Sequence, residues 1–123
     1  MCGNNPTGST SPFRYATSPA VDVSGAATLK LGFYRWLNSD ADGWMTSTVD
    51  VYDGTSWVNL YTNPSGAGNI TADSAWTKVE YDVTAQKNAA FRVRFGYAVT
   101  DSGVYEMSCW NVDDVTLSTA SCP

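Results

Sequence analysis

Two adjacent aspartates, Asp113 and Asp114, are the side chains in this sequence best suited to hold a cation. They interrupt the segment 110–117, WNVDDVTL, whose apolar residues can share one face of a strand only if a β-bulge lies at the aspartates. Two carboxylates beside apolar neighbours are costly unless they are hydrogen-bonded or neutralised. Ca²⁺ is the natural partner for ligands that offer only oxygen. We therefore expect a bulge here, with either a calcium ion or one aspartate bonded to the backbone and the other solvated.

A second group of oxygen-bearing side chains, Asn38, Asp40 and Asp42, alternates along the chain and is followed by Gly43. This spacing matches the first half of a calcium-binding loop. The second half does not match, because the twelfth position is Val49, where an EF-hand needs a bidentate glutamate. A polar turn accounts for the same residues without a metal. Both interpretations remain open from the sequence.

Short alternating segments separated by turn residues predict that the chain is built from strands. The strongest is 28–37, in which Leu31 and Phe33 lie on one face while Tyr34 and Trp36 lie on the other. A hairpin is expected at 53–54, an Asp-Gly pair between strands at 46–52 and 57–61. The remaining expected segments are strands at 15–23, 76–83, 90–99 and 104–117, a loop or arm at 1–13, a long loop at 62–73 and a helical or turn-like crossover at 84–90.

Eight or so strands with no long helical period predict an all-β fold, a jelly-roll β-sandwich of two antiparallel sheets. A chain of 123 residues is near the commonest size of one domain, so residues 1–123 are expected to form one sandwich. With 43% hydrophobic and only 15% charged residues, the composition is that of a chain that folds around a core.

One outward face is expected to gather aromatic and charged side chains, provided that the strands carrying them share a sheet. Sugars are recognised in this way, because their C–H faces stack on rings while their hydroxyls take hydrogen bonds. The alternative is that a loop covers the rings and that the arginines pair with Glu80 and Asp50 across strands. The expected ligand residues are Tyr34, Trp36, Asp50, Tyr52, Glu80, Arg92 and Arg94.

Charge and composition exclude several classes of function. Seven Lys and Arg against twelve Asp and Glu give a net charge of −5, which does not suit a nucleic-acid backbone. No apolar run is long enough to span a membrane. The chain has no histidine, which removes Ser-His and Cys-His catalysis, and it has no glycine-rich phosphate loop. A non-catalytic protein is therefore expected.

The three cysteines indicate an exported origin with one disulfide and one thiol left over. They form no CxxC pair, which argues against a zinc site. Cys2 with Cys122 is the favoured pair, because the first and last strands of β-sandwiches often lie side by side, and Cys109 with Cys122 is the alternative. The N-terminal sequence lacks the features of a signal peptide. We therefore expect Met1 to begin a domain excised from a longer protein that carries the export signal.

Most of residues 15–117 resembles bacterial secreted MAM-like and cleaved-adhesin-like jelly-roll domains. The segments that carry the resemblance are YATSPAVDVSGAATLKLGFYRWLNSD, VDVYDGTSWVNL, SAWTKVEYDVT, FRVRFGY and WNVDDVTL. The chain is also similar to calcium-bearing β-sandwich carbohydrate-binding modules. That similarity implies that Asp113 or Asp114 is a calcium ligand, completed by an acidic group near the N-terminal strand, for which Asp22 is available.

The resemblance implies a secreted or cell-surface binding module with a structural calcium. Carbohydrate, as a polysaccharide or a cell-surface glycan, is the leading ligand. The alternatives are a protein–protein adhesion or assembly domain, and a structural spacer appended to a secreted enzyme.

Overall fold

The computed structural model describes residues 10–104 and 109–119, and almost all of its regular structure is β-strand. One short 3₁₀ turn, η1 (Thr84–Gln86), lies where a helical or turn-like crossover was expected. The strands are β1 (Ser11–Thr17), β2 (Lys30–Ser39), β3 (Met45–Tyr52), β4 (Trp57–Thr62), β5 (Thr71–Ala72), β6 (Thr77–Asp82), β7 (Arg92–Val99) and β8 (Cys109–Ser118).

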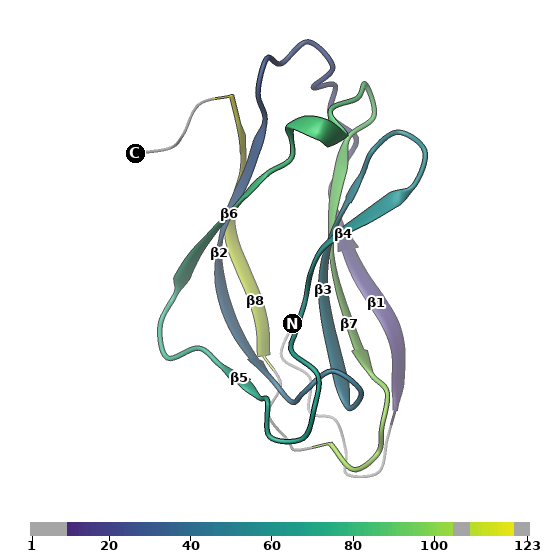
Figure 1. Ribbon diagram of the computed structural model, residues 1–123, viewed down its shortest axis with the longest axis vertical. Coiled ribbons are helices and arrows are strands. Elements are labelled where there is room, and N and C mark those ends of the chain that lie inside the picture. The colour runs from purple at the N-terminus through teal and green to yellow at the C-terminus, as the bar shows by residue number, and fades with distance from the viewer. Residues whose placement is uncertain (1–9, 105–108, 120–123) are drawn as a thin grey trace.

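Two antiparallel sheets of four strands face each other (Figure 1). In the first, which we call the β3 sheet, the strand order is β1-β7-β3-β4. In the second, the β2 sheet, β2 pairs with β8 along one side and with β6 and then β5 along the other. The predicted all-β fold, a jelly-roll β-sandwich of two antiparallel sheets, is confirmed.

The core lies between the sheets and is filled by the inward side chains of β2, β3, β7 and β8. Phe33 of β2 packs edge-on against Phe95 of β7, with ring centroids 5.1 Å apart. Phe95 in turn lies 6.0 Å from Trp110 of β8. Each fully buried apolar side chain contributes roughly 1.5–3 kcal/mol. The alternation predicted for β2 is confirmed, since Leu31 and Phe33 are buried while Tyr34 is exposed.

Arg35 lies in the same inward row and is accommodated by partners from both sheets. Its Nε and Nη2 atoms donate to the carboxylate of Asp73 at 2.9 Å each. Its guanidinium carbon lies 5.4 Å from the ring centre of Tyr61 on β4. Burial is the largest single influence and opposes the charge of Arg35. The hydrogen bonds to Asp73 and the charge interactions with Tyr61, Asp73 and Tyr81 together outweigh it and raise the pKa of the guanidinium. A charged residue can therefore occupy a core-facing position at this edge of the sandwich.

The bulge expected in the last strand is present. Pairing between β2 and β8 shifts by one residue between Gly32↔Thr116 and Tyr34↔Asp113. At the shift, Asp114 has φ of 49°, a left-handed conformation that Asp tolerates better than most residues do. Asp113 accepts the backbone N–H of Asp114 through Oδ1 at 2.8 Å. The extra residue is thus absorbed at the two aspartates.

The structure differs from prediction at the start of the chain. The segment 1–13 was expected to be a loop or arm, but β1 already begins at Ser11 and pairs with β7 from Ser11↔Val99 onward. The strand expected at 15–23 ends at Thr17, because Pro19 has no N–H to donate to a ladder. A single bridge, Val21↔Phe91, follows it. The long loop expected at 62–73 includes the short strand β5.

Candidate functional site

The side chains predicted to form one ligand face lie on two different faces. Tyr34, Trp36 and Glu80 belong to β2 and β6, in the β2 sheet. The other four predicted ligand residues belong to β3 and β7, in the β3 sheet: Asp50, Tyr52, Arg92 and Arg94. The prediction of a single face is wrong, because β2 and β3 are consecutive in sequence but lie in opposite sheets.

On the β3 sheet, the charged side chains are engaged with one another. Arg94 Nε donates to Asp50 Oδ2 at 2.9 Å, and Asn59 Nδ2 donates to Asp50 Oδ1 at 2.9 Å. The guanidinium of Arg94 lies between two rings, 4.0 Å from the centre of Tyr15 and 4.1 Å from that of Trp57. These contacts use both the charge and the flat faces of Arg94, so this cluster stabilises the sheet.

The pairing predicted as the alternative to ligand binding is correct for Asp50 with Arg94 and wrong for Glu80 with Arg92. Glu80 instead accepts from Lys30 Nζ at 2.9 Å within the β2 sheet. Arg92 lies over the ring of Tyr52, with its guanidinium carbon 5.9 Å from the ring centre.

On the outer face of the β2 sheet there is a hollow of about 440 Å³, which we call the central hollow. Gly32 lies at its middle, paired with Glu80 on β6 and with Thr116 on β8. Because Gly32 has no side chain, it leaves a gap between the side chains of Glu80 and Thr116. A Cβ added at Gly32 would lie 3.1 Å from Thr116 Oγ1. The other outward-facing residues that line the hollow include Tyr34, Lys78 and Asp114.

A second hollow of about 210 Å³, which we call the aromatic–acid hollow, is lined by Tyr34, Trp76, Asp113 and Asp114. Tyr34 and Asp114 line both hollows. Trp76 is 46% exposed and meets the half-buried ring of Trp36 edge-on at 6.0 Å, so Trp36 supports Trp76. Tyr34 is 39% exposed. Two large rings thus stand in solvent beside carboxylates.

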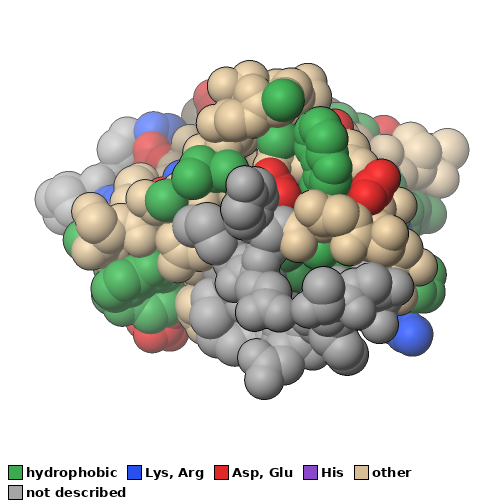
Figure 2. All heavy atoms as spheres, turned by 90° about the horizontal axis from the view of Figure 1, so that it is seen from below, with side chains coloured by type: hydrophobic (Ala, Val, Ile, Leu, Met, Phe, Trp, Pro, Cys, Tyr) green, Lys and Arg blue, Asp and Glu red, His purple; other side chains and the backbone are tan. Residues whose placement is uncertain are grey.

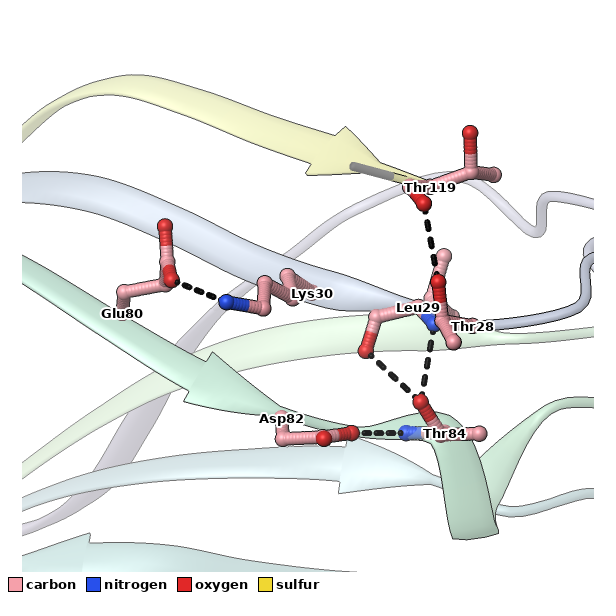
Figure 3. A network of polar contacts seen from close by, with 7 residues as sticks. All are labelled: Thr28, Leu29, Lys30, Glu80, Asp82, Thr84 and Thr119. Carbon is pink, nitrogen blue, oxygen red and sulfur yellow. Dashed lines mark hydrogen bonds and ion pairs between the residues drawn. The ribbon is translucent and has the colours of Figure 1, made fainter. Parts of the chain in front are cut away.

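Hydrogen bonds fix the end of the β2 sheet next to the central hollow (Figure 3). Thr84 Oγ1 accepts the N–H of Leu29 at 2.9 Å, and Thr28 Oγ1 donates to the carbonyl of Thr119 at 2.8 Å. The hydrogen bond from Lys30 lowers the pKa of Glu80, and the same bond raises the pKa of Lys30. Glu80 is therefore an ionised carboxylate in the wall of the hollow, and the ammonium group of Lys30 balances its charge.

The loop predicted as a second calcium site is organised by a buried amide. Asn63 Nδ2 donates to the carbonyls of Asp40 and Met45 at 2.9 and 2.8 Å, and its Oδ1 accepts the N–H of Ser47 at 2.7 Å. The carboxylate of Asp40 accepts the N–H of Ala41, and Gly43 has a positive φ of 104°. These contacts have the form of a polar turn.

The remaining predicted metal ligands also have local partners. Asp42 accepts from the hydroxyl of Thr46 at 2.6 Å. Asn38 lies in β2, opposite Ala72 and Cys109. Asp22 accepts from the N–H and the hydroxyl of Ser24, and the hydroxyl bond is the main cause of its lowered pKa. Figure 2, which views the end of the sandwich where β2 meets β5, shows acidic side chains set among hydrophobic and uncharged ones.

Within residues 10–104 and 109–119, no three acidic or cysteine side chains gather as a metal site. Ca²⁺ takes six to eight oxygen ligands, and Asp113 and Asp114 alone supply too few of them. The calcium site stays a prediction, since the search covers only the described residues. The predicted disulfide also stays a prediction, because Cys2 and Cys122 lie outside those residues.

The ligand residues expected from the sequence did not include Gly32, Trp76, Lys78 or Thr116. A lone glycine inside a strong strand is a signal that could have marked the hollow, because it weakens the strand unless something approaches closely. The partners on β6 and β8 follow only from the register.

Comparison with known proteins adds no family to this description: no family model matches the chain, and no curated protein matches its sequence. In the part of the chain that the structure describes, no helix is long and apolar enough to cross a membrane.

Proposed function

We propose that this chain is a non-catalytic, secreted carbohydrate-binding module that binds a polysaccharide or cell-surface glycan on the outer face of its β2 sheet. The observation that carries the proposal is the pair of adjoining hollows with Tyr34 at their junction and Trp76 at one side. Exposed rings beside fixed polar groups suit the C–H faces and hydroxyls of sugars.

The polar lining supports the same ligand. Glu80 and Thr116 flank Gly32 across the strands, and Lys78 flanks Tyr34. Carboxylate, ammonium and hydroxyl groups together donate and accept hydrogen bonds, as sugar hydroxyls require. Because these side chains project from strands of one sheet, their spacing is set by the ladder and not by a loop.

Protein adhesion is the alternative, and it needs a broad apolar surface. The exposed large hydrophobic residues of the described chain come from several segments in both sheets and the loops: Phe13, Tyr15, Val21, Tyr34, Ile70, Trp76 and Val115. This distribution favours carbohydrate over a protein partner.

The test is affinity electrophoresis of the whole chain through gels that contain soluble β-glucan, xylan, mannan or chitosan. Tyr34→Ala should weaken binding about tenfold, the loss expected when an anchoring ring at the centre of a site is removed. Phe13→Ala is the matched control, because Phe13 is also 39% exposed but belongs to the β3 sheet.

Retardation by at least one polysaccharide, lost in Tyr34→Ala and retained in Phe13→Ala, supports the proposal. If no polysaccharide retards the folded chain, or if both variants bind like the parent chain, the proposed face is wrong.

A further inference from the structure

We infer that the aromatic–acid hollow binds an organic ammonium group, so that the preferred glycan is one with free amines. The inference rests on the proposed function and adds the chemical class of the sugar. Its basis is the juxtaposition of two exposed rings, Tyr34 and Trp76, with two consecutive carboxylates, Asp113 and Asp114, around one hollow.

The residues that line this hollow are two aromatic residues and two aspartates. A ring face attracts a cation through its quadrupole, and a carboxylate accepts short, strong hydrogen bonds from a charged N–H group. A protonated amine on a sugar can use both, while the sugar ring stacks on an aromatic side chain. A uronic acid or a sulfated sugar would meet like charge at Asp113 and Asp114.

The two carboxylates have no cationic partner in the described part of the chain. The three ion pairs found there are Lys30 with Glu80, Arg35 with Asp73 and Arg94 with Asp50. Lys78 lies across from Tyr34 on β6 and lines the central hollow, not this one. An arriving ammonium group therefore meets carboxylates whose charge no lysine or arginine has neutralised.

The bulge explains how two neighbours in sequence reach the same hollow. In a regular strand, Asp113 and Asp114 would point to opposite faces of the sheet. Here Asp113 lies opposite Tyr34, and the left-handed backbone of Asp114, with φ of 49°, redirects the second carboxylate. Both residues are exposed and line the hollow. The irregularity in β8 thus concentrates negative charge next to the exposed rings.

The same lining favours an organic cation over a metal ion. Ca²⁺ needs six to eight oxygen ligands, and half of the residues around the hollow present aromatic rings. Rings contribute little to oxygen coordination, whereas they do stabilise an ammonium group.

The volume indicates that one group of a longer ligand enters. About 210 Å³ is below the roughly 300–1,000 Å³ of pockets that hold a whole small molecule. The central hollow of about 440 Å³ adjoins it at Tyr34 and Asp114. A chain of amino sugars can therefore place one amine in the aromatic–acid hollow and the next residue in the central hollow.

The test compares two oligosaccharides of equal length by isothermal titration calorimetry at about pH 6, where carboxylates are ionised. One is a fully deacetylated glucosamine oligomer, and the other is its N-acetylated counterpart, which has the same backbone but no charge. The glucosamine oligomer should bind about tenfold more tightly, the value of one partly desolvated cation–π and ion contact. Asp114→Asn should remove that preference, because it should weaken binding of the glucosamine oligomer more than binding of the acetylated oligomer.

Asp22→Asn is the matched control, because it removes the same charge from an exposed aspartate that lines neither hollow. If Asp22→Asn and Asp114→Asn weaken binding of the glucosamine oligomer equally, the attraction is a diffuse one between the acidic protein and a polycation, and the inference is overturned. Equal binding of both oligomers would overturn it as well and leave the proposed function standing. If calcium chloride raises the melting temperature of the parent chain but not of Asp114→Asn, the hollow is a metal site and the inference is wrong. Failure of the proposed function is distinct, since the chain would then bind no polysaccharide at all.

Discussion

The guanidinium of Arg94 donates a hydrogen bond to the carboxylate of Asp50 at 2.9 Å, and its central carbon lies 4.0 Å and 4.1 Å from the ring centres of Tyr15 and Trp57. The four residues come from four different strands, β7, β3, β1 and β4. One side chain therefore links the whole width of the β3 sheet, from one edge strand to the other.

Replacing Arg94 by Lys should destabilise the domain although the charge is kept. Lysine lacks the planar fork that contacts both rings and the carboxylate. We expect a loss of about 1–3 kcal/mol in the free energy of unfolding, measured by urea denaturation. Arg92→Lys is the control, since Arg92 is exposed and lies 5.9 Å from the ring centre of Tyr52. Equal losses for the two variants would show that the position of Arg94 between the rings does not matter.

Gly96→Ala should loosen β1 from the sheet. A Cβ at Gly96 would lie 2.6 Å from Tyr15 Cε1 and 2.5 Å from Thr48 Oγ1, so the ring of Tyr15 has to move. We expect a cost of about 1–3 kcal/mol and faster hydrogen exchange of the β1 amides. Gly25→Ala is the control, because a Cβ there meets nothing within 4 Å. Unchanged exchange in β1 would contradict the prediction.

The strands could be predicted because local pattern determines them. Alternation gave the two faces of β2, and the Asp-Gly pair at 53–54 gave the hairpin, in which Tyr52 pairs with Trp57. The failed alternation of WNVDDVTL gave the bulge, because apolar residues on both sides of the aspartates had to face the same core. In each case the signal lies within about ten residues of the structure it predicts.

The assignment of strands to sheets could not be predicted in this way. Periodicity fixes which side chains of a strand share a face, but it does not say which strand is its neighbour. The sequence therefore predicts that Tyr34 and Tyr52 share a face, although they lie in opposite sheets. Trp76 precedes β6, and only the register and its contact with Trp36 place it at the site.

Asn63→Ala should destabilise the turn between β2 and β3. The buried amide satisfies two carbonyls, of Asp40 and Met45, and one N–H, of Ser47. Leaving several buried backbone groups without partners should cost about 2–4 kcal/mol in the free energy of unfolding. Asn69→Ala serves as the control, because its side chain is exposed and donates only to the carbonyl of Ser65. A loss no larger than that of the control would argue against the amide as the centre of this turn.

Acid should weaken the β2 sheet through two carboxylates whose pKa values are lowered. The hydrogen bond from Lys30 lowers the pKa of Glu80, and the hydroxyl and N–H of Thr84 lower that of Asp82. A lowered pKa in the folded state means that the stabilisation is complete above the pKa of the unfolded chain, about 4. It is lost as the pH falls from there through the folded-state pKa. The melting temperature should therefore hold steady near neutral pH and decline below about pH 4.

Glu80→Gln should flatten part of that decline, because glutamine keeps a hydrogen-bond acceptor for Lys30 but does not titrate. Lys30→Met should flatten it too, since Glu80 without its cation returns toward its ordinary pKa. Both changes remove the Lys30–Glu80 ion pair, and Lys30→Met also removes the smaller charge effect of Lys30 on Asp82. The double variant should therefore lose little acid dependence beyond that lost by Lys30→Met. Melting curves recorded from neutral pH to about pH 2.5 test this. If the melting temperature falls equally in acid for the parent chain and for Glu80→Gln, the Lys30–Glu80 pair does not cause the loss of stability.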